Sequence, residues 1–271
     1  RIIREFKPDV AVGTGCYVCY PVLKAASELG VPTAVHESNA VPGLTTKMLE
    51  GSVDTIMVGF EESRANYRHP DRVEVTGTPV RVDFLNPDKA AAKRELGIPE
   101  GRPLVVSVWG SLGASHMNEI MTDFILRACA KPFFSLIHSA GKAGYSKMSA
   151  ALESEKPDYA KLGMDVRAYI YDMPRVMAAA DLVLCRAGAS TLAELTAMGK
   201  PAILVPSPNV TNNHQERNAR VLEAAGGARV MLEQDFTADS LLGLVSELLQ
   251  HPEQLDEMSK KMLELGVPDA T

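Results

Sequence analysis

A buried strand in this sequence runs into a turn of small residues and then into a helix that opens with hydroxyl side chains. The strand covers residues 182–184, Gly188 permits a tight turn, and Ser190 or Thr191 is placed to cap the helix. The first backbone N–H groups of such a helix can bind a phosphate. Glu194 follows one turn later, where a carboxylate could accept both hydroxyls of a ribose. The segment is typical of a nucleotide-diphosphate site, although Thr191 and Glu194 also fit a capping box that only closes the helix end.

Two further turns in the same half of the chain follow buried strands. Gly110, Ser111 and Gly113 form a small-residue turn that opens a helix, and its amides could hold a phosphate. Such turns are also common for packing reasons alone. Ile170 lies between two tyrosines at another strand end, where its backbone N–H and C=O could pair with a flat base. Taken by itself, that segment is more typical of an ordinary strand end.

A polar run at residues 209–218 connects a strand to a helix. His214, Gln215 and Asn218 are spaced to share one face across the first helical turn. Amide side chains in such numbers suit the hydroxyls of a sugar. A solvated loop explains them nearly as well.

The first half of the chain offers three more polar candidates. Asn39 can donate to and accept from a sugar, and His36 could be a general base because an unperturbed histidine has a pKa of about 6.5. A single histidine after a buried strand is more often a structural hydrogen-bonding group. Arg81 could neutralise a diphosphate by a forked contact. No Asp-x-Asp pair occurs, so we predict no metal site and leave helix ends, hydroxyls and Arg81 to bind the diphosphate.

The composition is that of an ordinary soluble globular protein, with 46% hydrophobic and 23% charged residues among 271. A formal charge of −6, without a run of Lys and Arg, argues against a nucleic-acid partner. No apolar stretch approaches the roughly 20 residues of a transmembrane helix, and no leader opens the chain. We therefore expect a cytosolic or peripheral protein.

The four cysteines do not make a disulfide framework, and the apolar neighbours of Cys129 and Cys185 predict reduced core thiols. Cys16 and Cys19 differ, because Cys-x-x-Cys between a strand and a helix is also the position of a thioredoxin-like redox pair. A zinc site has less support, since no second close pair of Cys or His completes a tetrahedral set.

Strands and helices alternate along the chain, which predicts an α/β fold with parallel sheets. We expect a partial first domain at residues 1–80, a linker rich in turn formers at 81–97 and a complete doubly wound domain at 98–271. The first unit has expected strands at 10–12, 33–36, 55–58 and 73–76, and helices at 21–29, 44–50 and 61–67. The second has expected strands at 104–108, 134–138, 166–169, 182–184, 202–205 and 229–232, and helices at 114–128, 145–153, 174–180, 191–198, 213–225, 237–250 and 252–265.

Five segments, in this order, closely resemble the bacterial peptidoglycan N-acetylglucosaminyltransferases, which make lipid II from lipid I. They are His36-Glu-Ser-Asn-Ala-Val-Pro-Gly-Leu-Thr45, Gly77-Thr-Pro-Val-Arg81, Gly110-Ser-Leu-Gly-Ala114, Asp181-Leu-Val-Leu-Cys-Arg-Ala-Gly-Ala-Ser-Thr-Leu-Ala-Glu194 and Pro206-Ser-Pro-Asn-Val-Thr-Asn-Asn-His-Gln215. Five ordered segments are far more specific than any one of them.

The resemblance implies a GT-B fold of two Rossmann-like domains, the first one incomplete here. It implies inverting transfer of N-acetylglucosamine (GlcNAc) from UDP-GlcNAc to the 4-hydroxyl of N-acetylmuramic acid (MurNAc) pentapeptide on undecaprenyl diphosphate, which is lipid I. It further implies no cofactor, and an enzyme bound peripherally to the anionic cytoplasmic face of the bacterial cell membrane.

The resemblance also assigns roles to residues, although it identifies no catalytic residue. It implies that Ile170 reads the uracil, that Glu194 binds the ribose, and that Arg81 lies near the diphosphate. The positions that match the donor site are Asn39, Arg81, Ser111, Ile170, Ala189, Ser190, Thr191, Glu194, His214 and Gln215. Of these, Ser111 and Ala189 to Thr191 match diphosphate contacts, and His214 and Gln215 match contacts to the transferred sugar.

On the acceptor side the resemblance points to Gly15, Tyr17 and His36. The family's glycine-rich acceptor turn stands here as Gly13-Thr-Gly-Cys-Tyr-Val-Cys-Tyr-Pro21. It departs from the usual glycine at Cys16 and from the usual serine-glycine pair at Cys19 and Tyr20. The acceptor contact is therefore less firmly implied than the donor contact.

We expect about 90 residues to precede Arg1 in a complete first domain, at about 30 residues per strand-helix-strand unit. The family's amino-terminal glycine-rich loop, with its histidine, has no counterpart in the sequence, so we expect weak nucleotide binding and poor transfer or none. Two alternatives remain. One is a related glycolipid glycosyltransferase, such as a diacylglycerol glycosyltransferase, and the other is a nucleotide-binding module without catalysis.

Overall fold

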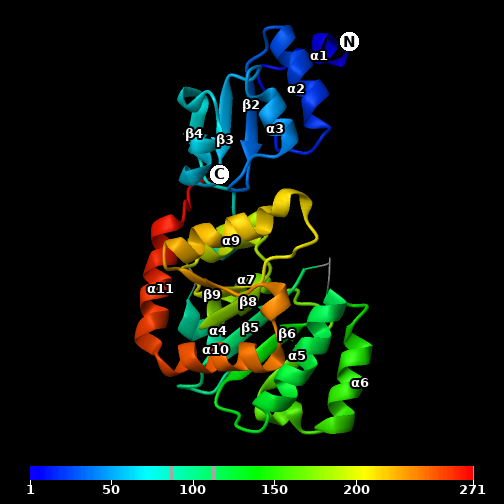
Figure 1. Ribbon diagram of the computed structural model, residues 1–271, viewed down its shortest axis with the longest axis vertical. Helices are drawn as coiled ribbons and strands as arrows, with labels where there is room; N and C mark the ends of the chain where they lie inside the picture. Colours follow the sequence, from blue (N-terminus) through cyan, green and yellow to red (C-terminus); the bar gives the residue numbers. More distant parts are fainter. Residues whose placement is uncertain (86–87, 111–113, 271) are drawn as a thin grey trace.

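The computed structural model describes residues 1–85, 88–110 and 114–270. In this part of the chain the strands form two separate parallel sheets, one in each half of the sequence (Figure 1). The two Rossmann-like units predicted from the alternation of strands and helices are confirmed.

The first sheet has four parallel strands in the order β1-β2-β3-β4. They are β1 (Ala11–Gly13), β2 (Thr33–Glu37), β3 (Thr55–Val58) and β4 (Val73–Val75), which confirms the four expected strands. Helices α1 (Ile2–Phe6), α2 (Cys19–Glu28) and α3 (Leu44–Leu49) belong to this unit. The helix expected at residues 61–67 is present, but it is not an α-helix. Glu61–Asn66 is a 3₁₀ helix, the form that short connecting segments often take.

The second sheet has six parallel strands in the order β10-β9-β8-β5-β6-β7. The chain starts at the centre of this sheet, moves to one edge, and then returns to build the other, which is the order of dinucleotide-binding sheets. The strands lie within two residues of their predicted positions. They are β5 (Leu104–Val108), β6 (Ser135–Ser139), β7 (Met164–Arg167), β8 (Leu182–Cys185), β9 (Ala202–Leu204) and β10 (Ala228–Val230).

Helices cover both faces of the second sheet, and its central strands are buried over nearly their whole length. One core lies under α5 (Ala114–Ala128), α6 (Tyr145–Glu155) and α10 (Ala238–Gln250). The other lies under α4 (Lys89–Glu95), α7 (Met173–Ala179), α8 (Ala189–Ala197), α9 (His214–Ala224) and α11 (Pro252–Leu265). In β5, Val105 packs in the first of these cores and Val106 in the second, because successive side chains of a strand point to opposite faces.

Helix α4 lies within the segment that we expected to be a linker, and it packs against α7. Lys89 and Lys93 of α4 form ion pairs with Asp181 at 2.7 and 2.5 Å. Burial raises the pKa of Asp181, but these ion pairs and a hydrogen bond from the Leu104 N–H outweigh it and hold that pKa below its usual value. Helix α4 is therefore attached to the second sheet. The domain boundaries at residues 80 and 97 remain a prediction.

The chain passes between the two units twice, once after β4 and again after α11, where the carboxyl-terminal residues return to the first unit (Figure 1). Val267 packs against Gly77 there, and a Cβ on Gly77 would lie only 2.5 Å from the Val267 Cβ. Gly77 also has a φ of 72°, so only glycine fits without strain. Among the residues that the structure describes, no helix has the length and apolarity to cross a membrane.

Candidate functional site

The second sheet reverses its strand order between β5 and β8, which are hydrogen-bonded neighbours at its centre. The connections that leave the carboxyl ends of these two strands lead to α5 and α8, and such a point opens a crevice in which α/β proteins bind ligands. The connection after β8 contains Gly188 and leads directly into α8, which begins at Ala189.

The amino-terminal end of α8 differs from the prediction in its cap. Gly188 is the N-cap residue, with a φ of −69° and a ψ of 136°, and no side chain among the described residues caps the helix. The predictions that Ser190 or Thr191 caps the helix, and that Thr191 and Glu194 form a capping box, were wrong, because the helix begins earlier and places both hydroxyls inside it. The backbone N–H groups of Ala189, Ser190 and Thr191 have no hydrogen-bond acceptor within the described residues, as expected for a first helical turn. They are thus available to an anion.

Glu194 lies one turn further along α8 than Ser190, on the same side of the helix. Its side chain is half-buried and takes part in no hydrogen bond within the described part of the chain. Burial raises the pKa of the Glu194 carboxyl, and the charge of Arg81 opposes that shift only in part. A half-buried carboxylate without a protein partner is an acceptor held ready for hydroxyl groups.

Arg81 belongs to the segment that first crosses between the units, and its side chain is exposed. Its guanidinium lies over the ring of Phe84 at 5.1 Å from the ring centroid, while Phe84 itself is buried. This contact holds a cation near the crevice at little cost in desolvation. The structure therefore brings Arg81 and Glu194 close enough to interact, although 113 residues separate them in the sequence.

Ile170 lies between β7 and α7. Its side chain is buried in the core, and neither its backbone N–H nor its C=O is hydrogen-bonded within the described residues. β7 is the outermost strand of its edge, whereas α7 contacts the central strand β5, so the connection carrying Ile170 runs back toward the crevice. Tyr169 and Tyr171 flank it, exposed by 54% and 83%, with ring centroids 4.8 Å apart. Sequence reasoning passed over these two rings. Ser111, the other phosphate candidate, lies outside the described residues.

His214 and Gln215 are the first two residues of α9. One polar atom of each side chain is hydrogen-bonded to a backbone group of the protein. His214 Nδ1 lies 2.9 Å from the carbonyl oxygen of Thr211 and donates to it, which leaves Nε2 as an acceptor. Gln215 Oε1 accepts from the Ser207 N–H at 2.9 Å, which leaves its NH₂ group as a donor. The two side chains thus present one acceptor and one donor in fixed orientations.

Asn218 and Asn39 join the two halves of the chain, and sequence reasoning missed this contact. Asn218 is fully buried in α9 and accepts from the Ala40 N–H at 2.8 Å. Its NH₂ group donates to Asn39 Oδ1 at 3.0 Å and to the Ala187 carbonyl at 3.3 Å. Asn39 also donates its own NH₂ to Glu37 Oε1 at 3.0 Å. Both ends of the Asn39 side-chain amide are therefore hydrogen-bonded to other side chains of the protein. Its assignment as a contact to the sugar-nucleotide donor stays a prediction, which this geometry does not favour.

The acceptor-side candidates gather at the carboxyl ends of β1 and β2. A hollow of about 250 Å³ lies there, and Gly15, Cys16, Glu37 and Thr45 are among its lining residues. Tyr17 stands beside it in the same turn, 78% exposed. Glu37 organises the opposite wall, because its Oε2 accepts from the Gly43 N–H and from the Thr46 hydroxyl, both at 2.9 Å.

His36 has a different environment from the other acceptor-side candidates. It is buried, its Nε2 lies 2.8 Å from the Gly77 carbonyl oxygen, and its Nδ1 lies 3.3 Å from the Ser38 hydroxyl. Nε2 can only donate to that carbonyl, so Nδ1 is the acceptor. Both ring nitrogens are in use. The geometry fits the structural alternative for His36 better than a general base, and its acceptor-side role stays a prediction.

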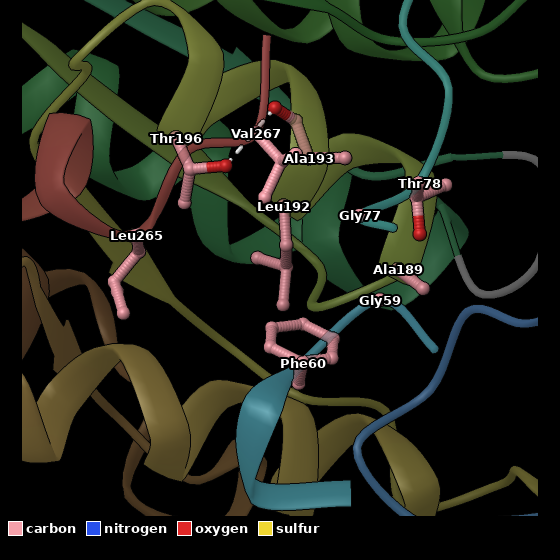
Figure 2. A pocket seen from close by; sticks show the side chains of 10 residues that line it. All are labelled: Gly59, Phe60, Gly77, Thr78, Ala189, Leu192, Ala193, Thr196, Leu265 and Val267. Atoms are coloured by element: carbon pink, nitrogen blue, oxygen red, sulfur yellow. Dashed lines mark hydrogen bonds between the residues drawn. The ribbon is translucent and has the colours of Figure 1, made fainter. Parts of the chain in front are cut away.

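Helix α8 also packs against the first unit, along the face that carries Leu192 and Thr196. Figure 2 shows the narrow gap between α8 and the first unit, which Phe60 and Gly77 line from the first unit and Leu192 lines from α8. Thr196 turns its hydroxyl back to the Ala193 carbonyl at 3.1 Å instead of into the gap (Figure 2). The gap holds about 20 Å³, which is room for about one water molecule. It is a packed interface and not a ligand site.

Comparison with known proteins agrees with this arrangement. Residues 1–58 match the glycosyltransferase family 28 N-terminal domain, and residues 104–271 match the glycosyltransferase family 28 C-terminal domain. A UDP-N-acetylglucosamine–N-acetylmuramyl-(pentapeptide) pyrophosphoryl-undecaprenol N-acetylglucosamine transferase from Acetivibrio thermocellus is 42% identical over all of this chain and 72% of its own length. The enzyme of the same name from Bacillus cytotoxicus is 41% identical over all of this chain and 73% of its own length.

Solved structures agree as well. The MurG structure from Acinetobacter baumannii is 27% identical, with a TM-score of 0.79 over all of this chain and 73% of that chain. The UDP-GlcNAc 2-epimerase from Neisseria meningitidis, at 14% identity and a TM-score of 0.70 over 99% of this chain and 75% of its own, shares the fold alone. From its two parallel sheets, the crevice at α8 and these matches, the chain belongs to glycosyltransferase family 28 and has the GT-B fold.

Proposed function

We propose that this chain transfers GlcNAc from UDP-GlcNAc to the 4-hydroxyl of MurNAc-pentapeptide on undecaprenyl diphosphate, with inversion, as a step of bacterial peptidoglycan synthesis. The observation that carries the proposal is the amino-terminal turn of α8. Within the described residues, its N–H groups and the Glu194 carboxylate have no hydrogen-bond partner and lie in one crevice. The 42% identity to an enzyme named for this transfer supports the choice of substrates.

The donor is expected to lie along the carboxyl edge of the second sheet. The backbone of Ile170 would pair with the uracil, and Glu194 would accept the ribose hydroxyls. The N–H groups of Ala189 to Thr191, with Arg81, would face the diphosphate, and Ser111 remains proposed there from its sequence position alone. His214 Nε2 and the Gln215 NH₂ would contact hydroxyls of the sugar.

This arrangement suits departure of the nucleotide. When the bond between sugar C1 and the diphosphate oxygen breaks, negative charge develops on the UDP. The positive end of the α8 dipole and the Arg81 guanidinium would stabilise that charge without reorganising. The acceptor 4-hydroxyl would attack C1 from the opposite face and lose its proton to a base that we leave unassigned. The hollow near Gly15 and Tyr17 would receive the acceptor.

We further propose a peripheral position on the anionic cytoplasmic face of the cell membrane, because an undecaprenyl-linked acceptor is held in a bilayer. The exposed apolar side chains of Tyr17, Val18, Leu44 and Met48 lie in the same half of the chain as the proposed acceptor hollow. They support a membrane-facing side for the first unit.

The experiment is a transfer assay with labelled UDP-GlcNAc and a lipid I analogue in detergent, with diacylglycerol as the competing acceptor. Labelled lipid II analogue as the product supports the proposal. Product on diacylglycerol alone would replace it by a related glycolipid glycosyltransferase. Binding of UDP-GlcNAc with no product on either acceptor would replace it by a nucleotide-binding module without catalysis.

A further inference from the structure

The turn Cys16-Tyr17-Val18-Cys19, between β1 and α2, carries a cysteine at each of its two ends. The Cys19 N–H donates to the Cys16 carbonyl at 3.1 Å and closes a four-residue turn. The ends of such a turn have Cα atoms less than about 7 Å apart. Disulfides bridge Cα atoms separated by about 4.4–6.8 Å. The backbone therefore already has a separation at which these two cysteines can be joined.

The two thiols have unequal surroundings. Cys16 is exposed and has a φ of 65°, in the left-handed region that side chains other than glycine adopt at a cost. Cys19 is the first residue of α2 and is only partly exposed, and its Sγ donates to the Gly15 carbonyl at 2.5 Å. The Cys16 thiol is thus open to a dissolved reagent, whereas the Cys19 thiol, three residues further along the same turn, is less exposed and hydrogen-bonded.

The remaining cysteines provide an internal contrast. Cys129 and Cys185 are both buried, and burial raises the pKa of each thiol, that of Cys185 to about 12. Buried thiols that stay protonated react slowly with disulfides, because the thiolate is the nucleophile. Any thiol oxidation of the folded chain should therefore be confined to the turn.

We propose that Cys16 and Cys19 are a modification site, which small-molecule disulfides oxidise reversibly to an intramolecular disulfide. The Cys16 thiolate attacks one sulfur of the reagent and displaces one thiolate of the reagent. The Cys19 thiolate then attacks the Cys16 sulfur of this mixed disulfide and releases the second reagent thiolate. The reagent accepts two electrons, the protein pair loses two electrons, and the two protein protons pass to the two released thiols.

The modification would alter the acceptor side, a consequence that rests on the proposed function. Cys16 lines the hollow at the carboxyl ends of β1 and β2. The disulfide would tie Cys16 to α2 and remove the Cys19 thiol hydrogen bond to Gly15. Because the proposed donor contacts belong to the second unit and to the segment of Arg81, and not to the turn of Cys16 and Cys19, UDP-GlcNAc affinity should stay unchanged.

The test counts thiols. The folded chain is treated with excess glutathione disulfide, unfolded and alkylated, and its mass is measured by mass spectrometry. Alkylated cysteines should fall from four to two per chain, with the loss mapped to Cys16 and Cys19 and reversed by dithiothreitol. Cys19→Ser should instead retain glutathione on Cys16, and Cys129→Ser should still lose the same pair.

Four alkylated cysteines in the treated chain would overturn the proposal. So would stable glutathione on Cys16 of the unsubstituted chain, because Cys19 would then have failed to displace it. The thiol count makes no use of sugar transfer, so its result is independent of the transfer assay. A change in UDP-GlcNAc affinity on oxidation would contradict the confinement of the effect to the acceptor side.

Discussion

At the scale of single residues, Glu194 is the side chain whose environment is most specific to a ligand. It is half-buried, bears a raised pKa because of that burial, and has no hydrogen-bond partner within the described residues. Replacing Glu194 by Gln keeps the shape but removes the charge. We expect UDP-GlcNAc to bind more weakly by roughly 1.5–3 kcal/mol, the contribution of a hydrogen bond to a charged group. Titration calorimetry measures this as a rise in Kd of about 10- to 150-fold.

The matched control is Glu264→Gln, which removes an exposed carboxylate paired with Lys261 in α11. Its Kd for UDP-GlcNAc should equal that of the unsubstituted chain. An unchanged Kd for Glu194→Gln, in a variant with an unaltered unfolding midpoint, would show that Glu194 does not contact the ribose.

The same carboxyl predicts how binding depends on pH. Because its pKa lies above the usual value, Glu194 takes up a proton at a higher pH than an ordinary glutamate does. Protonation removes the charged acceptor, so UDP-GlcNAc affinity should fall as the pH is lowered, starting above the usual pKa of about 4.3. UDP-GlcNAc is the better probe than UDP, because it lacks the terminal phosphate that titrates near pH 6. Glu194→Gln should show a flatter profile, and parallel profiles would contradict the assignment.

At the scale of elements, the sequence predicted α8 and the strand before it but not the way the helix starts. Apolar periodicity places β8 and α8 within two residues, because that signal is shared by many positions. The cap depends on the backbone angles of the single residue Gly188, and Ser190 and Thr191 were equally plausible caps in the sequence. The first-turn N–H groups that motivated the prediction lack an acceptor among the described residues, as they would with either cap.

Arg186, the first residue after β8, forms a buried ion pair with Glu233 at 2.7 Å, and this pair fixes the connection after β8. Arg186 also donates to the Val205 carbonyl at 3.1 Å, so it ties together the carboxyl ends of three strands, β8, β9 and β10. Replacing Arg186 by Met would leave the Glu233 carboxylate without its partner. We expect a loss of about 3–5 kcal/mol in the free energy of unfolding.

Urea unfolding followed by tryptophan fluorescence measures that loss, because Trp109 is the sole tryptophan and packs on Phe236, close to Glu233 in the chain. The double variant Arg186→Met with Glu233→Leu should recover most of the stability, since no charge is then left buried and unpaired. A double variant as unstable as the single one would mean that packing of the Arg186 side chain, and not its charge, holds the connection.

At the scale of the whole molecule, the sequence predicted two parallel sheets but not how they meet. The alternation of strands and helices is local and survives in any sequence with this fold. The contact between Asn39 and Asn218 joins residues 179 positions apart, and neither segment carries a sequence pattern that indicates the other as its partner. Asn218 was therefore grouped with His214 and Gln215 as a sugar contact, whereas burial turns it toward the first unit. The attachment of α4 through Asp181 was missed for the same reason.

The hydrogen bonds of Asn218 should contribute to holding the two units in a fixed relative position. Replacing it by Ala removes the acceptor for the Ala40 N–H and the donor to Asn39 and Ala187. We expect the relative position of the units to loosen, at a cost of about 1–3 kcal/mol for buried groups left unpaired. Small-angle X-ray scattering should show a larger radius of gyration, and the Ala40 amide should exchange its hydrogen faster. Asn66→Ala is the matched control, because Asn66 donates to Ala40, Glu62 and Ser63 within the first unit. A scattering curve of Asn218→Ala that matches those of Asn66→Ala and of the unsubstituted chain would show that the hydrogen bonds of Asn218 do not fix the position of the units.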